Sequence, residues 1–276
     1  MQHYPFIHGY KVETVFKDSS TSLLFQIYDQ DDQLVLMKVS KLTESNQENL
    51  ILPKLQHPNI ISALQVFDDP TAIMIPFIHS QTLDEYLLST PPSFDILQKI
   101  FFDLIEGVEY IHTMGFLHGD LRPVNILMDL KHHPIIIDFA QASTIQNPRD
   151  RILPNTPLDT IAPEIKKGET WSIQSDIYGL GMVLEALLAK CIDPHNVEVH
   201  WYKVCIDCKE PQPENRPEGI QGLRSKLLSP SEKSALFEKP ENFGISEDNE
   251  QIPTKWIFIG VLMIFLGIFL GLVIAS

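Results

Sequence analysis

An acid and an amide stand five residues apart in the stretch FLHGDLRPVNILMD, residues 116–129. The apolar residues at its two ends predict short buried strands, so the polar residues between them must lie on a loop that is anchored to a core on both sides. Asp120 and Asn125 would then be held rigidly. A carboxylate can accept a proton from a hydroxyl, and oxygen atoms of carboxylates and amides are ligands that Mg²⁺ prefers. This pair therefore fits metal-assisted phosphoryl transfer.

The elements before this loop are mainly strands. Residues 10–40 alternate between apolar and polar side chains in three segments, YKVETVF, SLLFQIYD and QLVLMKVS, with polar turns between them. A short helix is expected to begin at Thr43 or Ser45 and to end near Pro53, whose ring cannot continue it. The segments HPNIISALQVF and AIMIPFI predict two further strands. The first part of the chain is thus expected to be a small sheet with one helix.

Beyond residue 94 the apolar residues recur at helical spacing. Six of them predict a long amphipathic helix: Leu97, Ile100, Phe101, Leu104, Val108 and Ile111. The segment PIIIDF predicts a buried strand, and residues 176–189 predict a largely apolar helix within a core.

Length, net charge and cysteine content limit the classes of protein to which the chain can belong. The chain has 276 residues, long enough for one or two domains with a sizeable core. Its formal net charge of −15 argues against a nucleic-acid partner, because phosphate binding requires clustered Lys and Arg. Three cysteines, Cys191, Cys205 and Cys208, are too few for a disulfide scaffold. A lone Cys-x-x-Cys pair favours a structural role over a metal site, and a reducing compartment is expected.

The C-terminal residues 256–276 contain no charged side chain and are long enough to span a bilayer as a helix. Polar residues 228–255 are expected to be a linker. No signal peptide is expected, because the N-terminal residues lack a basic region followed by an apolar stretch. These features predict a single-pass tail anchor with the globular part in the cytosol. Gly260, Gly267 and Gly271 lie on one face of the predicted helix, which allows a homodimer through close helix packing, although glycine is also simply common in membrane helices.

Four separated motifs occur in one order along the chain. Lys38 ends VLMK on a predicted strand, H-x-D-x4-N follows with Asp120 and Asn125, Asp138 begins DFA, and Ala-Pro-Glu ends at Glu164. Over residues 10–227 this order resembles the protein kinase superfamily. The resemblance implies an α+β, two-lobed fold, with a β-rich N-lobe at 1–79 and a larger helical C-lobe at 80–227. It also implies ATP and Mg²⁺ as cofactors and a protein substrate or docking partner.

The resemblance assigns chemical roles residue by residue. Lys38 would hold the α- and β-phosphates and would be paired with Glu48, which lies nine residues before His57. Asp138 and Asn125 would bind Mg²⁺. The substrate hydroxyl would meet Asp120, and Arg122 would neutralise the γ-phosphate. The segment DLRPVN is more similar to the Ser/Thr class than to the Tyr class.

Other positions receive structural or adenine-binding roles from the same resemblance. His118 would pack beneath the loop, Asp176 would accept hydrogen bonds from its backbone, and Glu164 would form a buried ion pair with Arg216. The adenine-binding positions are Leu24 above the base, Leu127 below it, Ile75 at the back, and backbone groups of residues 76–78, including the Ile78 N–H. Pro76 keeps the carbonyl that this hinge uses.

The sequence departs from the family pattern in the loop that covers the phosphates. Lys17, Ser19 and Ser22 stand where glycines are expected, so the backbone would approach phosphates less closely. Leu36 stands two residues before Lys38, where a small Ala normally leaves room for adenine. We expect weaker nucleotide binding from both changes.

Further departures concern regulation and substrate docking. Ala140 replaces the Gly of D-F-G, and Gly119 replaces an Arg that reads a phosphorylated activation segment. The helix that carries Glu48 is expected to lack its first turns. Only 52 residues separate Glu164 from Arg216, which indicates a trimmed helical region.

Three functions remain open from the sequence. The four charge-handling residues Lys38, Asp120, Asn125 and Asp138 favour an active Ser/Thr protein kinase. The lost glycines favour a pseudokinase that binds nucleotide or serves as a scaffold at a membrane. A small-molecule kinase of the same fold would suit the His-Gly-Asp triplet, but Ala-Pro-Glu and the helix at Asp176 argue against it.

Overall fold

The computed structural model describes residues 6–19, 22–41, 47–68, 71–149 and 158–228. The membrane-spanning segment predicted at 256–276 lies outside these residues, as does the predicted linker from residue 229 onward. No helix within the described ranges combines the length and the apolar character needed to cross a bilayer.

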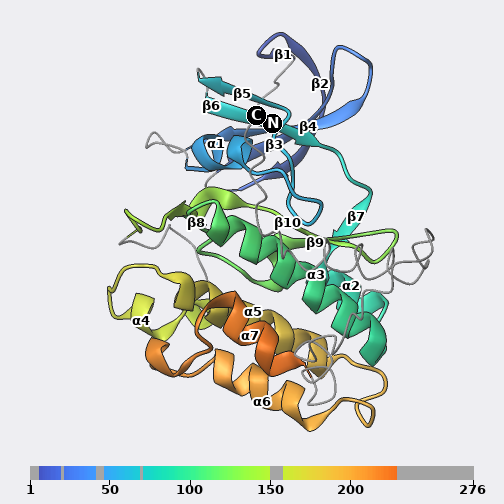
Figure 1. The fold of residues 1–276 in the computed structure, drawn as a ribbon. Coiled ribbons are helices and arrows are strands. Elements are labelled where there is room, and N and C mark those ends of the chain that lie inside the picture. Colours follow the sequence, from blue (N-terminus) through green and yellow to red (C-terminus); the bar gives the residue numbers. More distant parts are fainter. Residues whose placement is uncertain (1–5, 20–21, 42–46, 69–70, 150–157, 229–276) are drawn as a thin grey trace, which may run out of the picture. The chain divides into compact units, whose positions relative to one another are not determined.

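An antiparallel sheet forms the first part of the chain (Figure 1), with the strand order β1-β2-β3-β4-β6-β5. Side chains of β3 and β4 alternate between two environments, as the sequence predicts. Phe25, Ile27 and Met37 are fully buried on one face, whereas Leu24 and Lys38 point to the other. The bounds are β1 Phe6–Ile7, β2 Tyr10–Asp18, β3 Ser22–Tyr28, β4 Leu34–Ser40, β5 Gln65–Asp68 and β6 Thr71–Pro76.

A short helix and a loop connect β4 to β5. The helix α1 spans Gln47–Ile51 and continues as a 3₁₀ turn over Leu52–Lys54, so the helical segment ends near Pro53 as expected. The predicted start at Thr43 or Ser45 lies outside the described residues. The prediction of a strand beginning at His57 was wrong, because only Gln65–Asp68 is extended and paired. The Ile61 N–H donates instead to the carbonyl of Ile136 at 3.0 Å. This loop is therefore hydrogen-bonded to both parts of the chain, because the Leu64 N–H also donates to the Met74 carbonyl of β6 at 2.8 Å.

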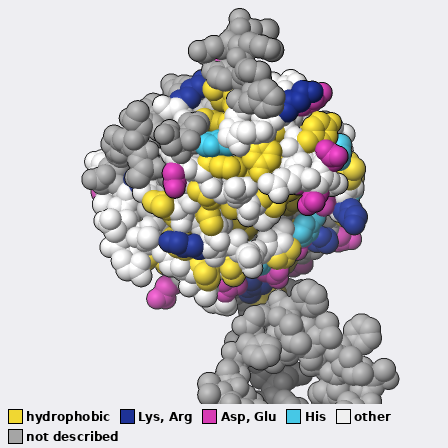
Figure 2. Space-filling model, turned by 90° about the horizontal axis from the view of Figure 1, so that it is seen from above, with side chains coloured by type: hydrophobic (Ala, Val, Ile, Leu, Met, Phe, Trp, Pro, Cys, Tyr) yellow, Lys and Arg dark blue, Asp and Glu magenta, His cyan; other side chains and the backbone are white. Residues whose placement is uncertain are grey.

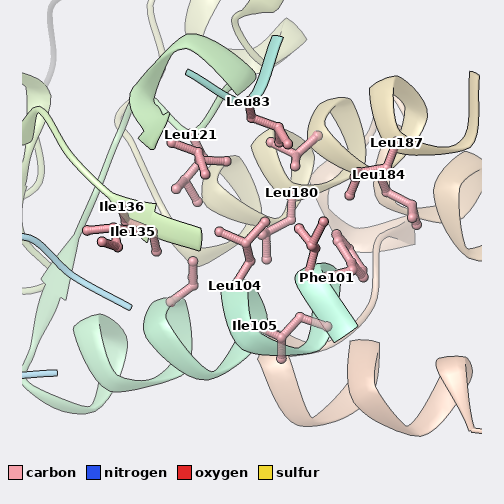
Figure 3. Close-up of a cluster of buried hydrophobic side chains, with 14 of the residues drawn as sticks. Leu83, Phe101, Leu104, Ile105, Leu121, Ile135, Ile136, Leu180, Leu184 and Leu187 are labelled. Atoms are coloured by element: carbon pink, nitrogen blue, oxygen red, sulfur yellow. The ribbon is translucent and has the colours of Figure 1, made fainter. Parts of the chain in front are cut away.

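The second part is mainly helical (Figure 1). The long helix α3, Phe94–Thr113, buries the apolar residues that predicted it against α5, Ile173–Ala189. Figure 3 shows Leu104 of α3 and Leu180 of α5 within one cluster of buried side chains, to which Leu121 and Ile136 also belong. The remaining helices are α2 Leu83–Ser89, α4 Pro163–Lys166, α6 Val199–Cys208 and α7 Gly219–Leu227.

Two small sheets hold the loop at residues 118–125. The strand β9 pairs with β10 on one side and with β7 on the other, and β8 pairs with β11. The loop therefore leaves one sheet at Leu117 and enters another at Ile126, with both ends buried. The bounds are β7 Ser80–Thr82, β8 Phe116–Leu117, β9 Ile126–Asp129, β10 Pro134–Ile136 and β11 Ser143–Thr144.

The cysteines are packed inside the helical part. Cys205 and Cys208 are buried on α6, and burial raises the pKa of the Cys205 thiol to about 11. That thiol therefore stays protonated near neutral pH and behaves as a small apolar side chain.

On the face drawn in Figure 2, charged side chains of both signs lie singly or in small groups among hydrophobic ones.

Candidate active site

A cleft of about 1080 Å³ lies between the N-terminal sheet and the helical part. Its walls combine apolar side chains from β3, β4 and β6 with polar ones from the loop at 118–125. Most of the residues assigned from the sequence to nucleotide binding and catalysis line it. These are Leu24, Lys38, Glu48, Ile75, Ile78, Asp120, Arg122, Leu127 and Asp138.

Lys38 forms two ion pairs at the centre of this cleft. Its Nζ lies 2.6 Å from Glu48 Oε2 and 2.8 Å from Asp138 Oδ1. Burial lowers the pKa of Lys38, but the two carboxylates outweigh that effect and raise it overall. In turn, the lysine holds the pKa of Asp138 well below its usual range. Lys38 and Asp138 are therefore both charged near neutral pH, as a site for a phosphate–cation complex requires.

The backbone at Asp138 directs its carboxylate into the cleft. Asp138 adopts a left-handed conformation with φ of 65°, and a 3₁₀ turn over Phe139–Gln141 follows. The Phe139 ring is fully buried and packs edge-on against His118, with 4.8 Å between ring centroids. Its N–H donates to Glu48 Oε1 at 3.2 Å. The helix α1 and the Asp138 segment are thereby fastened together.

Asp120 lies beside two polar partners on its own loop, residues 118–125. Asn125 Nδ2 donates to Asp120 Oδ2 at 2.7 Å, and Arg122 Nε lies 3.1 Å from Asp120 Oδ1. Burial raises the pKa of Asp120, while the Arg122 charge opposes that rise. Asn125 itself is buried and does not line the cleft, and its amide oxygen is the atom that remains for a cation.

The buried carboxylate of Asp176 supports this loop from below. It accepts hydrogen bonds from the backbone N–H groups of His118 and Gly119, at 2.9 and 2.8 Å. His112 Nε2 also lies 2.9 Å from it, an interaction that the sequence did not predict. Burial raises the pKa of Asp176, but its interaction with His112 and the other nearby groups lowers it overall. The expected packing of His118 beneath the loop is also present, since its side chain is fully buried.

Glu164 and Arg216 meet as the sequence predicted. The guanidinium donates to both carboxylate oxygens, each at 2.7 Å, and both residues are buried. Arg216 also donates to the carbonyls of Gln174 and Glu210. The pair therefore ties α4 to α5 and to the loop before α7.

The roof of the cleft is a hydrogen-bonded turn between β2 and β3. Ser19 N–H donates to the Ser22 carbonyl at 2.9 Å, and Ser22 N–H donates to Ser19 Oγ at 3.0 Å. Lys41, the residue after β4, stabilises the turn by an ion pair with Asp18 and by a hydrogen bond that it donates to the Ser19 carbonyl. Leu36 lines the cleft, as expected.

Several cleft residues were not identified from the sequence. They include Phe16 from β2, His79 from the segment after β6 and Glu85 from α2. Lys17 and Phe77 also line the cleft, and the sequence had already assigned them to the loop over the phosphates and to the hinge. The rings of Phe16 and Phe77 meet edge-on at the mouth, with 6.2 Å between centroids. The register of β2 against β3 shifts at Phe16, and this shift brings the Phe16 ring to the cleft. The alternation of apolar and polar residues along the strand does not indicate the shift.

Comparison with known families decides what this arrangement is. Residues 21–234 match the model of the protein kinase domain. The chain belongs to the protein kinase domain family. The match covers both parts of the described fold, and it includes Lys38, Asp120, Asn125 and Asp138.

Proteins named as serine/threonine protein kinases are among the relatives of this chain, at low identity. CBL-interacting serine/threonine-protein kinase 1 of Arabidopsis thaliana is 29% identical over 189 residues, which are 65% of this chain and 42% of the relative. The probable serine/threonine-protein kinase PknB of Lactococcus lactis is 27% identical over 172 residues, or 57% of this chain and 27% of the relative. The kinase thus spans less than half the length of these relatives.

The donor set of the kinase suits Mg²⁺ and a nucleotide. Asp138 presents a charged carboxylate, and Asn125 retains an amide oxygen, both hard ligands of the type that Mg²⁺ takes. Apolar side chains of Leu24, Leu36 and Leu127 also line the cleft, where a planar base would be desolvated. The residues present therefore fit both groups.

Proposed function

We propose that the chain is an ATP- and Mg²⁺-dependent protein kinase that phosphorylates Ser or Thr side chains. The observation that carries the proposal is the cluster of Lys38, Glu48 and Asp138 beside Asp120 in one cleft. Structural ion pairs are normally closed off by packing, whereas this cluster opens into a cavity of about 1080 Å³.

Each side chain has a distinct task in this proposal. Lys38, held by Glu48, binds phosphate oxygens. Asp120 orients the acceptor hydroxyl and receives its proton, and Arg122 offsets the negative charge near it. Mg²⁺ held by Asp138 and Asn125 would neutralise charge on the phosphates when bound. Little covalent chemistry is asked of the protein, since positioning and electrostatics lower the barrier.

The test is transfer of radiolabelled phosphate from ATP to a panel of Ser-, Thr- and Tyr-containing peptides by the full chain. Asp138→Asn is the inactive control, because it weakens the metal site and keeps the side chain's size. Transfer to Ser or Thr by the parent alone supports the proposal. Equal signals from both proteins would assign the transfer to a contaminant.

The turn over the cleft favours a second candidate, a nucleotide-binding or scaffolding module without turnover. Ser19 and Ser22 replace glycines there, and their N–H groups already have partners within the turn. The three variants Lys38→Met, Asp120→Asn and Asp138→Asn separate the two functions. A cellular role that survives all three would belong to a binding surface and not to catalysis.

We also propose that residues 256–276 anchor the kinase to a membrane, with the kinase domain in the cytosol. The support is the sequence alone: 21 consecutive residues carry no charge. Gly267 and Gly271 have the small-x3-small spacing that lets two helices pack closely as a homodimer. Crosslinking in membranes should give a dimer from the parent and not from a variant with both glycines changed to Leu. Recovery of the chain in the soluble fraction would refute the anchor.

A further inference from the structure

The strand β2 is irregular where it passes over the cleft. Val15 pairs with Phe25 and Lys17 pairs with Leu24, so Phe16 is an extra residue without a partner of its own on β3. A bulge of this kind changes the direction in which side chains point and often lies beside an active site. Phe16 and Lys17 consequently both line the cleft, although they are neighbours in the chain.

Register places Lys17 on the same face of the sheet as the central lysine. Lys17 lies opposite Leu24, and Leu24 lies opposite Lys38. Directly opposed residues in an antiparallel sheet share a face, so all three side chains point toward the cleft. Two strand spacings separate the lysine backbones, about 10 Å. Two ammonium groups can therefore approach the same polyphosphate from adjacent positions.

Among the described residues Lys17 lies within ion-pair distance of no carboxylate, and the carboxylate on which its charge acts is that of Glu85. Hydrogen bonds from Thr82 lower the pKa of Glu85 most, and the Lys17 charge lowers it further. Glu85 lines the same cleft from α2 but accepts hydrogen bonds from the N–H and hydroxyl of Thr82. The exposed ammonium of Lys17 is thus left available at the mouth of the cleft, beside the charged groups of Lys38 and Asp138.

The turn next to Lys17 has lost its usual means of binding phosphate. Backbone N–H groups in such a turn bind phosphate oxygens when glycines allow a close approach. Here the N–H of Ser19 donates to the Ser22 carbonyl, and the N–H of Ser22 donates to the Ser19 hydroxyl. A negative group beneath this roof therefore needs a positive partner from another source.

We propose that Lys17 is a second phosphate-binding lysine of the cleft, which takes over from the missing glycine N–H groups. It would contact the polyphosphate of ATP from the roof, while Lys38 contacts it from the centre of the sheet. The inference rests on the proposed use of ATP and adds a residue that determines how tightly its phosphates bind.

Calorimetric titration of the full chain with Mg-ATP and with adenosine tests this role. Lys17→Met should raise the Kd for ATP by about 10-fold, the usual effect of losing one charge-assisted contact. The Kd for adenosine should not change, because adenosine has no phosphate. Lys17→Arg should retain most of the affinity for ATP. Lys11→Met is the matched control, since Lys11 is an exposed lysine on the same strand and does not line the cleft.

Two results would overturn the assignment. ATP binding by Lys17→Met that equals that of the parent would show that the ammonium does not reach the phosphates. Equal weakening for ATP and adenosine would show that the residue only supports the shape of the cleft. A parent that binds no ATP would overturn the assignment and the proposed kinase activity together. A parent that binds ATP through Lys17 but transfers no phosphate would overturn the activity alone.

Discussion

Replacing Arg216 with Met should destabilise the domain strongly at neutral pH and far less in mild acid. The change removes the partner of a carboxylate that is buried, since Glu164 is only 3% exposed. In the parent, burial raises the pKa of Glu164, but the hydrogen bonds from Arg216 outweigh it and the pKa is lowered. Without the guanidinium, the Ser175 hydroxyl at 3.1 Å is the one side-chain donor to Glu164 that remains among the described residues, and the effect of burial prevails.

The size of the effect follows from the cost of keeping that carboxyl neutral. Breaking a buried ion pair by removing one partner costs about 3–5 kcal/mol. At pH 7, protonating a carboxyl whose unfolded pKa is about 4.3 costs about 3.7 kcal/mol, at about 1.36 kcal/mol per pH unit. The same cost is about 1 kcal/mol at pH 5. The difference in unfolding free energy between parent and variant should therefore shrink by roughly 2.7 kcal/mol over these two pH units.

The ionisation of Glu164 makes stability depend on pH in opposite directions in the parent and in the variant. The lowered pKa of Glu164 in the parent stabilises the fold above the unfolded pKa, and that contribution is lost as pH falls through the folded value. A raised pKa in the variant destabilises the fold at neutral pH, and the penalty disappears as pH falls toward the unfolded value. The two proteins should thus converge in stability as pH is lowered from 7 to 5.

Urea unfolding at pH 7, 6 and 5, followed by fluorescence of the buried Trp171 and Trp201, measures this difference. Lys226→Met is the matched control, because it removes an ion pair of 2.6 Å to Asp207 that is partly exposed. That variant should lose less than about 1 kcal/mol, with little dependence on pH. A loss for Arg216→Met that stays constant from pH 7 to pH 5 would refute the reasoning, since it would reflect lost packing and not a stranded carboxylate.

Three other changes test the catalytic loop. Asp120→Asn should abolish phosphoryl transfer while the Kd for ATP, measured by calorimetry, stays the same, because this carboxylate acts on the acceptor hydroxyl; a parallel loss of binding would contradict that role. Arg122→Gln should move the acidic limb of the pH profile of kcat/KM to higher pH, since Arg122 opposes the rise in the pKa of Asp120 that burial causes. An acidic limb at unchanged pH would mean that ionisation of Asp120 does not determine its position. Gly119→Ala should lower the free energy of unfolding by about 1–3 kcal/mol, because the residue has φ of 78° and a Cβ would lie 2.8 Å from the Gln141 carbonyl oxygen; unchanged urea denaturation would contradict that geometry.

The residues that handle charge could be located from the sequence because their chemistry restricts residue type and order. Lys38, Glu48 and Asp138 come together as predicted although 100 residues separate the first from the last. Glu164 and Arg216 likewise meet across 52 residues. The resemblance to a family supplied these long-range pairings, since no local pattern in either segment specifies its partner.

Features set by backbone hydrogen bonds could not be predicted in the same way. The sequence of residues 57–64 predicts a strand because Ile60 and Ile61 are apolar and β-branched. In the structure these two isoleucines are buried, and their backbone pairs with Ile136 of β10 in the other part of the domain. The bulge at Phe16 changes register by one residue and so reverses the face on which Lys17 lies. Alternation of residue types carries no mark of such a bulge.

Gly119 departs from the family pattern, in which an Arg is usual, and its backbone also takes part in holding the loop at residues 118–125. Asp176 accepts the N–H groups of residues 118 and 119, which keeps residue 119 in a left-handed conformation. A residue with a side chain would be strained there, whereas glycine is not. The same substitution removes the arginine that would bind a phosphate on the activation segment. The loop is thus already positioned by Asp176 and Asn125, and Gly119 can provide no response to such a phosphate. Control of this kinase through phosphorylation would have to act at another residue.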